Sequence, residues 1–359
     1  GTVMNNTYKY LIVKEAILKE IKEGRLSPGE KLKSEEEYSQ EYQVSLITIR
    51  KALTELTTDG YITRIRKKGT FVNDAPTEPA PAASHLIAVI ISANERYDIS
   101  YMKIIKGIQA MASQQNYSVL IEWCDRQPHQ EETAIRKMLT QNVEGFLLYL
   151  SDPKQNRYML SLIEERNLPY VLIDRCDHSY PCYYAGCDNF TGGLLATEEL
   201  IKAHHTKIAF AAYEFFLPSE QTRYDGFLCA MIKAGIPVDH HNLIRDVDTD
   251  VLAEQIKRRE FTAIFCCNDR LALNTIQGLA RAGLTIAQDY SIIGFDEWDD
   301  SLNKAAGLTT IRQDFQEVGR NSFYLLHSAI QGVLTGNHTK MISGVSIIRR
   351  TSVATCEEY

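Results

Sequence analysis

The segment after Ser45 carries side chains able to contact nucleic acid at helical spacing. One helix face, at i, i+3, i+4 and i+7, would hold Ile47, Arg50, Lys51 and Thr54. Arginine reads guanine through two parallel hydrogen bonds, and hydroxyls such as those of Ser45 and Thr48 donate to phosphates or bases, so this face has the chemistry to enter a DNA major groove. The alternative is that Arg50 and Lys51 are ordinary solvated charges on a surface helix.

A basic hairpin is expected shortly after this helix. Two short runs rich in β-forming residues, 61–65 and 70–72, flank the sequence Arg66-Lys67-Lys68-Gly69. Lys67 and Lys68 would lie at the turn, where they can meet phosphates across a groove.

A second group of polar residues follows apolar runs in the remainder of the chain. The strand candidates are 86–91, 119–123, 145–150, 170–174, 207–212, 263–267 and 291–295, separated by helical stretches. Continuous apolar strands alternating with helices predict parallel sheets covered on both faces. The polar residues gather at the carboxyl ends of these strands, which is the edge where open α/β sheets bind ligands.

The elements that position the first group are three helices. Apolar residues at spacings of three and four predict a first helix ending at Gly24, and Ser34 with Glu37 forms a capping box for a second. Ser45 is a good N-cap for the third. The following stretch 75–83, APTEPAPAA, is typical of an extended tether, so we expect a domain boundary there.

Composition narrows the class of protein. The 359 residues suffice for two or three domains, and residues 1–73 carry 13 Lys/Arg against 10 Asp/Glu while the whole chain has a net charge of −7. A mildly basic N-terminal region followed by an acidic remainder is typical of a protein that binds a polyanion at one local site. We see neither a membrane-length apolar run nor a signal-peptide pattern near the start, and we expect a cytoplasmic protein, nucleoid-associated when bound to DNA, without a membrane partner.

The eight cysteines are scattered, and the closest group is Cys176, Cys182 and Cys187 with His178 among them. Buried reduced thiols are the ordinary interpretation, and zinc or disulfides the alternative. We expect no metal and no cofactor. The chain also lacks G-x-G-x-x-G after the first strand candidate, a P-loop, H-E-x-x-H and G-x-S-x-G, so we expect a protein that is not an enzyme.

Residues 26–72 resemble the GntR family of winged-helix regulators. The matching positions are Pro28-Gly29, Leu32, Ser34-Glu35, Val44-Ser45, Thr48 to Leu53, Leu56, Gly60 and Gly69 to Val72. The sequence departs from the family where Leu46 and Ile47 replace usual base-reading residues, which favours thymine-methyl contacts and A·T pairs in the operator. The resemblance implies a DNA-contact set of Ser34, Glu35, Ser45, Leu46, Ile47, Thr48, Arg50, Lys51, Lys67, Lys68 and Gly69.

Residues 86–355 resemble the LacI/GalR type of effector domain, which is similar to periplasmic sugar-binding proteins. The motifs are 170–175 (YVLIDR), 223–227 (RYDGF), 264–279, 291–300 (SIIGFDEWDD) and 308–320. The fold expected is thus an α+β winged helix-turn-helix domain (4–73), a linker (74–84) and an α/β two-lobed periplasmic-binding-protein-like domain with parallel sheets (85–359). Lobe one would span about 85–186 and 314–340, and lobe two about 187–312 and 341–359.

The same resemblance implies a sugar site at the strand ends. Its candidate residues are Tyr97, Tyr101, Asp174, Arg175, Arg223, Asn268, Asp296, Trp298 and Gln313. Carboxylates, amides and arginines bind vicinal hydroxyls, and an aromatic ring covers the C–H side of a sugar. Asp269, Arg270 and Asp289 are equally consistent with capping or ion pairing.

This pairing of domains resembles the arabinose repressors of Gram-positive bacteria, which implies L-arabinose as the first candidate effector, with another pentose, a hexose or a short oligosaccharide still open. We expect a homodimeric repressor that binds a pseudo-palindromic operator in double-stranded DNA and is released by a small sugar. The alternatives are a sugar-activated activator, a sugar receptor without DNA function and an enzyme on a doubly wound fold.

Overall fold

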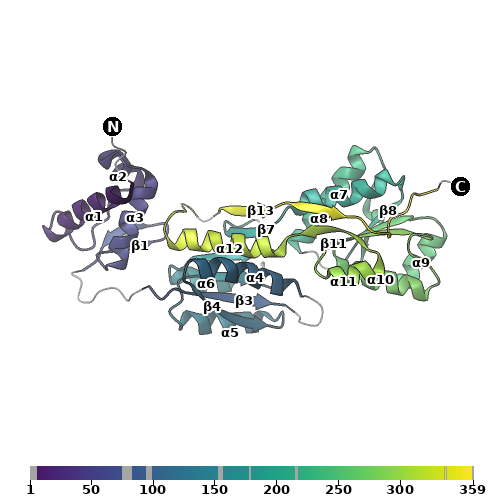
Figure 1. Cartoon of the computed structure of the whole chain (residues 1–359), viewed down its shortest axis with the longest axis horizontal. Coiled ribbons are helices and arrows are strands. Elements are labelled where there is room, and N and C mark those ends of the chain that lie inside the picture. The colour runs from purple at the N-terminus through teal and green to yellow at the C-terminus, as the bar shows by residue number, and fades with distance from the viewer. Residues whose placement is uncertain are drawn as a thin grey trace.

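The computed structural model describes residues 6–74, 83–93, 99–152, 157–177, 179–214, 217–334, 336 and 338–357. Three bodies lie in a row: a small N-terminal head (6–74), a first lobe beside it, and a second lobe that carries the C-terminus at the far end (Figure 1). Among the described helices, none has the length and apolar character needed to cross a bilayer.

The head is a three-helix unit with a hairpin. Its elements are α1 (Asn6–Lys22), α2 (Glu35–Tyr42), α3 (Leu46–Thr58), β1 (Ile62–Ile65) and β2 (Gly69–Val72). The predicted capping box is present, since the Ser34 side chain accepts the Glu37 N–H and the Glu37 carboxylate accepts the Ser34 N–H. Ser45 likewise caps α3 through the N–H of Thr48. Ile17, Ile49 and Leu56 are fully buried between the helices, and the expected winged helix-turn-helix fold is confirmed.

The first lobe is built on a six-stranded parallel sheet in the order β13-β7-β6-β5-β3-β4. These strands are β3 (Leu86–Ser92), β4 (Ser118–Cys124), β5 (Phe146–Tyr149), β6 (Tyr170–Ile173), β7 (Tyr183–Cys187) and β13 (Lys340–Ser343). Its helices are α4 (Ser100–Gln114), α5 (Pro128–Leu139), α6 (Arg157–Glu165) and α12 (Phe315–Ile330). One buried cluster packs α4 and α12 on one face of the sheet, and a second packs α5 and α6 on the other.

The second lobe repeats this plan with the strand order β14-β12-β11-β10-β8-β9. Its strands are β8 (Ile208–Ala212), β9 (Leu243–Arg245), β10 (Ala263–Cys266), β11 (Ser291–Asp296), β12 (Thr309–Gln313) and β14 (Val345–Ile348). Its helices are α7 (Asn189–Lys202), α8 (Pro218–Lys233), η1 (His240–Asn242), α9 (Thr249–Lys257), α10 (Asp269–Arg281) and α11 (Asp300–Ala306). Every strand pair is parallel except β12 with β14. The expected two-lobed α/β architecture is therefore confirmed.

The chain passes between the lobes three times. It leaves the first sheet after β7, returns after β12 and crosses again at Gly344, between β13 and β14. The sequence-based boundary at 340 assigned residues 341–343 to lobe two, but Met341 pairs with Ala185 of the first sheet. The short β13 has alternating exposed and half-buried residues, so no continuous apolar run marks it.

Glycines bring two helix pairs into backbone contact. A Cβ on Gly107 of α4 would overlap the carbonyl of Gln316 on α12, and one on Gly193 of α7 would overlap the backbone of Arg223 on α8. Only glycine permits this approach. The contact fixes α12 against the first lobe and places Arg223 at the inner edge of the second.

Candidate functional site

The first candidate surface lies on the head, where α3 meets the hairpin. Ile47 is 61% exposed and Lys51 is also exposed, with its Nζ atom 3.8 Å from the centre of the Tyr10 ring. Ser45 is exposed, whereas Thr48 is buried and its hydroxyl lies 2.8 Å from that of Ser45. The exposed part of this helix face is thus an aliphatic side chain beside a cation and a hydroxyl.

The hairpin adds two more cations to this surface. Lys67 and Lys68 are exposed in the turn that joins Ile65 to Gly69. Lys67 has a φ of 63° and Gly69 a φ of 126°. Glycine adopts such left-handed values without strain, which explains its place in the turn. Leu46 is half-buried, and Ser34 is exposed at the cap of α2.

Arg50 does not lie on the exposed face, contrary to the prediction. It is 7% exposed, its Nε atom donates to the Glu35 carboxylate at 2.7 Å, and its Nη1 atom donates to the backbone carbonyl of Val333 at 2.7 Å. Val333 follows α12 of the first lobe. The head therefore docks on the body through α3, the helix predicted to contact DNA bases. The helical spacing in the sequence contained no sign of this distant acceptor.

Two further residues complete the docking contact. Thr54 donates its hydroxyl to the Gln331 carbonyl at 3.3 Å, and Arg64 of β1 donates to the second oxygen of Glu35 at 3.2 Å. Glu35 thus bridges two arginines. Arg64 was missed from the sequence because it reads as an alternating strand residue. We call the hydrogen bonds of Arg50 and Thr54 to residues 333 and 331, together with the packing of Arg64 beside Gly332, the head–lobe contact.

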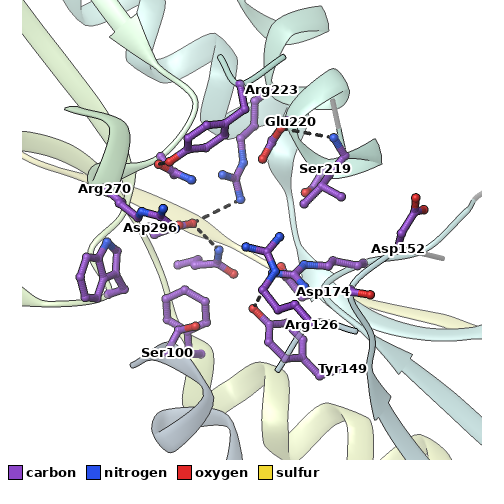
Figure 2. Close-up of a pocket in the computed structure, with 18 of the residues that line it drawn as sticks. Ser100, Arg126, Tyr149, Asp152, Asp174, Ser219, Glu220, Arg223, Arg270 and Asp296 are labelled. Carbon is purple, nitrogen blue, oxygen red and sulfur yellow. Dashed lines mark hydrogen bonds and ion pairs between the residues drawn. The ribbon is translucent and has the colours of Figure 1, made fainter. Parts of the chain in front are cut away.

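The second candidate site is a cavity of about 720 Å³ between the two lobes (Figure 2). Seven of the predicted site residues line it: Asp174, Arg175, Arg223, Asn268, Asp296, Trp298 and Gln313. They come from the ends of β6, β10, β11 and β12 and from α8. The carboxyl ends of parallel strands from both lobes thus face one space, as the α/β rule predicts.

Arg223 is held in this cavity by several hydrogen bonds. Its guanidinium donates to Asn189 at 2.9 Å, to the Cys267 carbonyl at 2.7 Å and to Asp296 at 3.3 Å. It also lies 3.7 Å above the Phe295 ring. Burial disfavours its charge, but Asp296 and other acidic neighbours outweigh burial and raise the pKa of Arg223. The side chain is therefore a fixed cation at the floor of the cleft.

Asp296, at the end of β11, is bonded to β12, the strand after which the chain crosses to the first lobe. The same carboxylate oxygen that pairs with Arg223 accepts a 2.7 Å hydrogen bond from the Gln313 amide. Burial raises the pKa of Asp296 to about 8, and the guanidinium of Arg223 opposes this rise. Its φ of 117° is unusual for a residue with a side chain. A ligand that donates to Asp296 would therefore meet an oriented carboxyl group that titrates near neutral pH.

The first lobe contributes a matching pair. Asp174, directly after β6, has a φ of 64° and its N–H donates to the Ala185 carbonyl at 2.8 Å. The next residue, Arg175, donates to the Leu150 carbonyl at 3.1 Å and to the Tyr149 hydroxyl at 3.4 Å. Both lobes thus present a carboxylate beside an arginine.

The three aromatic residues predicted to contact the sugar do not share one location. Trp298 lines the cavity, whereas Tyr101 packs edge-on against Trp123 at 4.5 Å within the first lobe and is not among the lining residues. Tyr97 lies outside the described residues. Tyr101 is drawn away because α4 turns it toward the neighbouring strand β4.

Several lining residues were missed from the sequence. They are Ser100, Asp125, Arg126, Gln127, Pro128, Tyr149, Ser151, Asp152, Tyr213, Leu217, Ser219, Glu220, Arg270 and Phe315. Tyr149 and Asp152 stand at and after the end of β5, as Asp174 stands after β6. The strand-end rule, applied to every strand, would have found them.

Asn268 and Asp269 have structural partners. The Asn268 carbonyl oxygen caps α10 at Leu271 and accepts the Tyr213 hydroxyl at 3.1 Å. Asp269 is fully buried, where it accepts from Thr310, Asn303 and the Glu297 N–H. Burial raises the pKa of Asp269 to about 7. These bonds give Asp269 a structural role within the second lobe, although the helix caps of α10 and α11 are Asn268 and Asp299. Within the described part of the chain, no three His, Cys, Asp or Glu side chains are grouped as a metal would require.

Comparison with known proteins matches both halves of the chain. Residues 9–72 match the model of bacterial regulatory proteins of the gntR family, and residues 197–353 match the periplasmic binding protein-like domain. The chain is 28% identical over 340 residues to the arabinose metabolism transcriptional repressor of Halalkalibacterium halodurans, covering 90% of this chain and 89% of that one. It is 30% identical over 273 residues to the HTH-type transcriptional repressor CytR of Escherichia coli K12, covering 74% and 79%.

One solved relative shares the body fold. The crystal structure of the lac repressor dimer bound to operator and the anti-inducer ONPF superposes with a TM-score of 0.63 at 23% identity, covering 76% of this chain and 94% of that one.

Proposed function

Because the chain belongs to the bacterial transcriptional regulators that join a GntR-type DNA-binding domain to a periplasmic-binding-protein-like domain of LacI type, we propose that it is a repressor whose operator affinity is set by a sugar in the interlobe cleft. The observation that carries the proposal is the convergence of Arg223, Asp296 and Gln313 with Asp174 and Arg175 around one cavity. Such a set offers donors and acceptors to several hydroxyls at once.

The lining favours a polyol over an apolar ligand. Carboxylates and arginines face the space from both lobes, and the Trp298 ring supplies an apolar face. Acidic side chains and arginines are present in nearly equal numbers in the lining, five against four, which suits an uncharged sugar. The name of the H. halodurans relative supports arabinose as the first sugar to test.

The exposed head surface is the proposed DNA contact. Ser45, Leu46, Ile47 and Lys51 would enter the major groove, and Lys67 and Lys68 would meet phosphates. The cap residue Ser34, the buried Thr48 bonded to Ser45, the turn residue Gly69 and the ion-paired Glu35 would position these groups. Arg50 would join them only after it leaves Val333.

The helix α12 links the two sites. It begins directly after Gln313 and Asp314 at the crossing between the lobes, Phe315 at its first turn lines the cleft, and residues 331–333 after its end hold Arg50 and Thr54. A sugar that changes the lobe angle would move the first lobe, and α12 with it, relative to the second lobe. We assign the head–lobe contact to the induced state, because Arg50 cannot reach a base while it is bound to Val333. Sugar would then shift the population toward the docked head.

Repression requires two heads at once. A homodimer would place them on the half-sites of a pseudo-palindrome. The lac repressor structure, which shares the body fold, is a dimer bound to operator. The linker predicted at 74–84, of which residues 75–82 lie outside the described residues, would act as the tether.

The test is an operator titration followed by fluorescence anisotropy, with duplexes from the promoters of neighbouring sugar-utilisation genes. We expect tight binding that weakens at least tenfold, about 1.4 kcal/mol, when L-arabinose is added, with D-arabinose as the stereochemical control. Binding to DNA that no sugar weakens would contradict the inducible repressor, and tighter binding with sugar would indicate an activator or co-repressor response. A thermal-shift screen identifies the ligand independently, because a sugar at 100 times its Kd stabilises the fold by about 2.7 kcal/mol.

A further inference from the structure

Two cysteines lie together beside the cleft but take no part in it. Cys176 and Cys182 are 1% and 3% exposed, in the loop that joins β6 to β7. Their sulfur atoms are 2.9 Å apart and share a hydrogen bond. A disulfide needs an S–S distance near 2.05 Å, so less than 1 Å of movement would bring the two sulfurs to bonding distance.

Both ends of this loop are held in place. The Asp174 N–H donates to the Ala185 carbonyl at 2.8 Å, and the Tyr184 hydroxyl donates to the Asp174 carbonyl at 2.9 Å. These bonds join the residue two before Cys176 to the residues two and three after Cys182. The loop therefore keeps the two thiols adjacent in the folded protein, and their pairing does not depend on a chance encounter.

The two sulfurs are not chemically equivalent. Hydrogen bonding from Cys176 lowers the pKa of Cys182, and the same bond raises the pKa of Cys176. The thiolate is the nucleophile in thiol oxidation. Cys182 lines a small cavity, whereas Cys176 is not among the residues that line it, so Cys182 is placed as the attacking sulfur and Cys176 as the thiol that resolves the product.

The access route limits the size of the oxidant. Cys182 lines a cavity of only about 10 Å³ together with Arg157, Asp177 and Tyr180. The Arg157 guanidinium in this lining lies 3.3 Å from the centre of the Tyr180 ring and 3.5 Å from the Asp177 carboxylate. A space of this size holds about one water molecule. A molecule as small as hydrogen peroxide fits with slight widening, while a glutathione disulfide does not.

We propose that Cys176 and Cys182 form a reversible dithiol–disulfide site that is oxidised by hydrogen peroxide. The Cys182 thiolate attacks one peroxide oxygen, breaks the O–O bond and becomes a sulfenic acid, and the departing hydroxide takes a proton to form water. The Cys176 sulfur then attacks the Cys182 sulfur and displaces hydroxide, which takes the Cys176 proton as a second water. One peroxide and two thiols give one disulfide and two waters. The site is independent of the identity of the cleft ligand.

Mass spectrometry of the full-length chain tests the proposal. The native protein is treated with hydrogen peroxide, unfolded in guanidinium chloride, alkylated with iodoacetamide and, after dilution, cleaved with trypsin, which releases residues 176–202 as one peptide with Cys176, Cys182 and Cys187. We expect this peptide to carry one alkyl group, on Cys187, in place of three, and dithiothreitol before alkylation to restore all three. Fragment ions locate the link.

Cysteine variants distinguish a disulfide between Cys176 and Cys182 from a general oxidation of thiols. Cys176→Ser and Cys182→Ser should abolish the link, whereas Cys229→Ser, at an exposed cysteine on α8, should leave it unchanged. Three alkylated thiols in the native peptide, under peroxide that oxidises Cys229, would overturn the proposal. So would a link that involves Cys187, or one that forms only in urea.

Discussion

The guanidinium of Arg50, on the helix that carries the proposed DNA contacts, is hydrogen-bonded at 2.7 Å to the backbone carbonyl of Val333, which belongs to the other folded part of the chain. One side chain therefore serves two competing partners in the proposed cycle, the body of the protein and the operator. This competition can be tested from both sides.

Replacing Arg50 removes the proposed base contact. Arg50→Ala should weaken specific operator binding by roughly 1–3 kcal/mol, the value of one bidentate base contact, as measured by anisotropy at fixed salt. Arg25→Ala provides the control, because Arg25 is an exposed head arginine outside α3 and the hairpin. Equal operator affinity of Arg50→Ala and the parent chain would remove Arg50 from the reading surface.

The head–lobe contact can be disturbed without touching the head. Gly332 has a φ of 69°, and a Cβ there would lie 2.8 Å from the Thr54 hydroxyl and 3.0 Å from Arg64. Gly332→Ala should therefore push the head off and reduce the loss of operator affinity on adding sugar. Gly235→Ala is a matched control, since Gly235 has a φ of 70° and open space around it. Both variants should lose about 1–2 kcal/mol of stability from the left-handed backbone, but only the first should change the sugar response.

Asp296 should make sugar binding depend on pH. A sugar hydroxyl donates more strongly to a carboxylate than to a neutral acid, so binding favours the ionised form and releases a proton. Since the pKa of Asp296 is raised to about 8, sugar affinity should increase from pH 6.5 to pH 9, by a difference of about 1 kcal/mol between charged and neutral hydrogen bonds. Asp296→Asn keeps an oxygen acceptor for Arg223 and Gln313 and should flatten this profile. Calorimetric titration across that range measures it, and a wild-type affinity that does not change with pH would contradict the proposed contact.

Arg223 should stabilise the fold through the same carboxylate. Arg223→Met leaves Asp296 buried without its cation, and breaking such a pair typically costs about 3–5 kcal/mol. Loss of the cation raises the pKa of Asp296 further, so the carboxyl is neutral in the folded state at pH 6 and must ionise against burial at pH 9. The loss in unfolding free energy, measured by urea denaturation, should therefore be larger at pH 9. Adding Asp296→Asn to Arg223→Met should remove this difference, and a loss equal at both pH values would argue against the coupling.

The sequence predicted the local features well. Ser34 and Ser45 cap helices as their spacing to Glu37 and Thr48 requires, because capping involves residues only three apart. The strand-end rule also brought Asp174, Asp296 and Gln313 to one cavity, because the carboxyl ends of parallel strands share an edge.

Features that depend on distant partners could not be predicted in this way. The burial of Arg50 depends on a carbonyl 283 residues away, and Tyr101 is withdrawn from the cleft by Trp123 on the adjacent strand. The edge strand β13 could not be recognised in the sequence, because it has no continuous apolar run. In each case the deciding contact is a tertiary one, which neither periodicity nor capping residues encode.

The length of α12 gives it mechanical leverage. Its 16 residues, at 1.5 Å per residue, form a rigid rod of about 24 Å. If the first lobe, with α12 fixed in it, rotates about the crossing by about 5°, the far end of α12 travels about 2 Å relative to a head held on the operator, and a hydrogen bond of ordinary length does not survive that displacement. A small rotation of the lobes around the sugar would thus be enough to make or break the hydrogen bond between Arg50 and Val333.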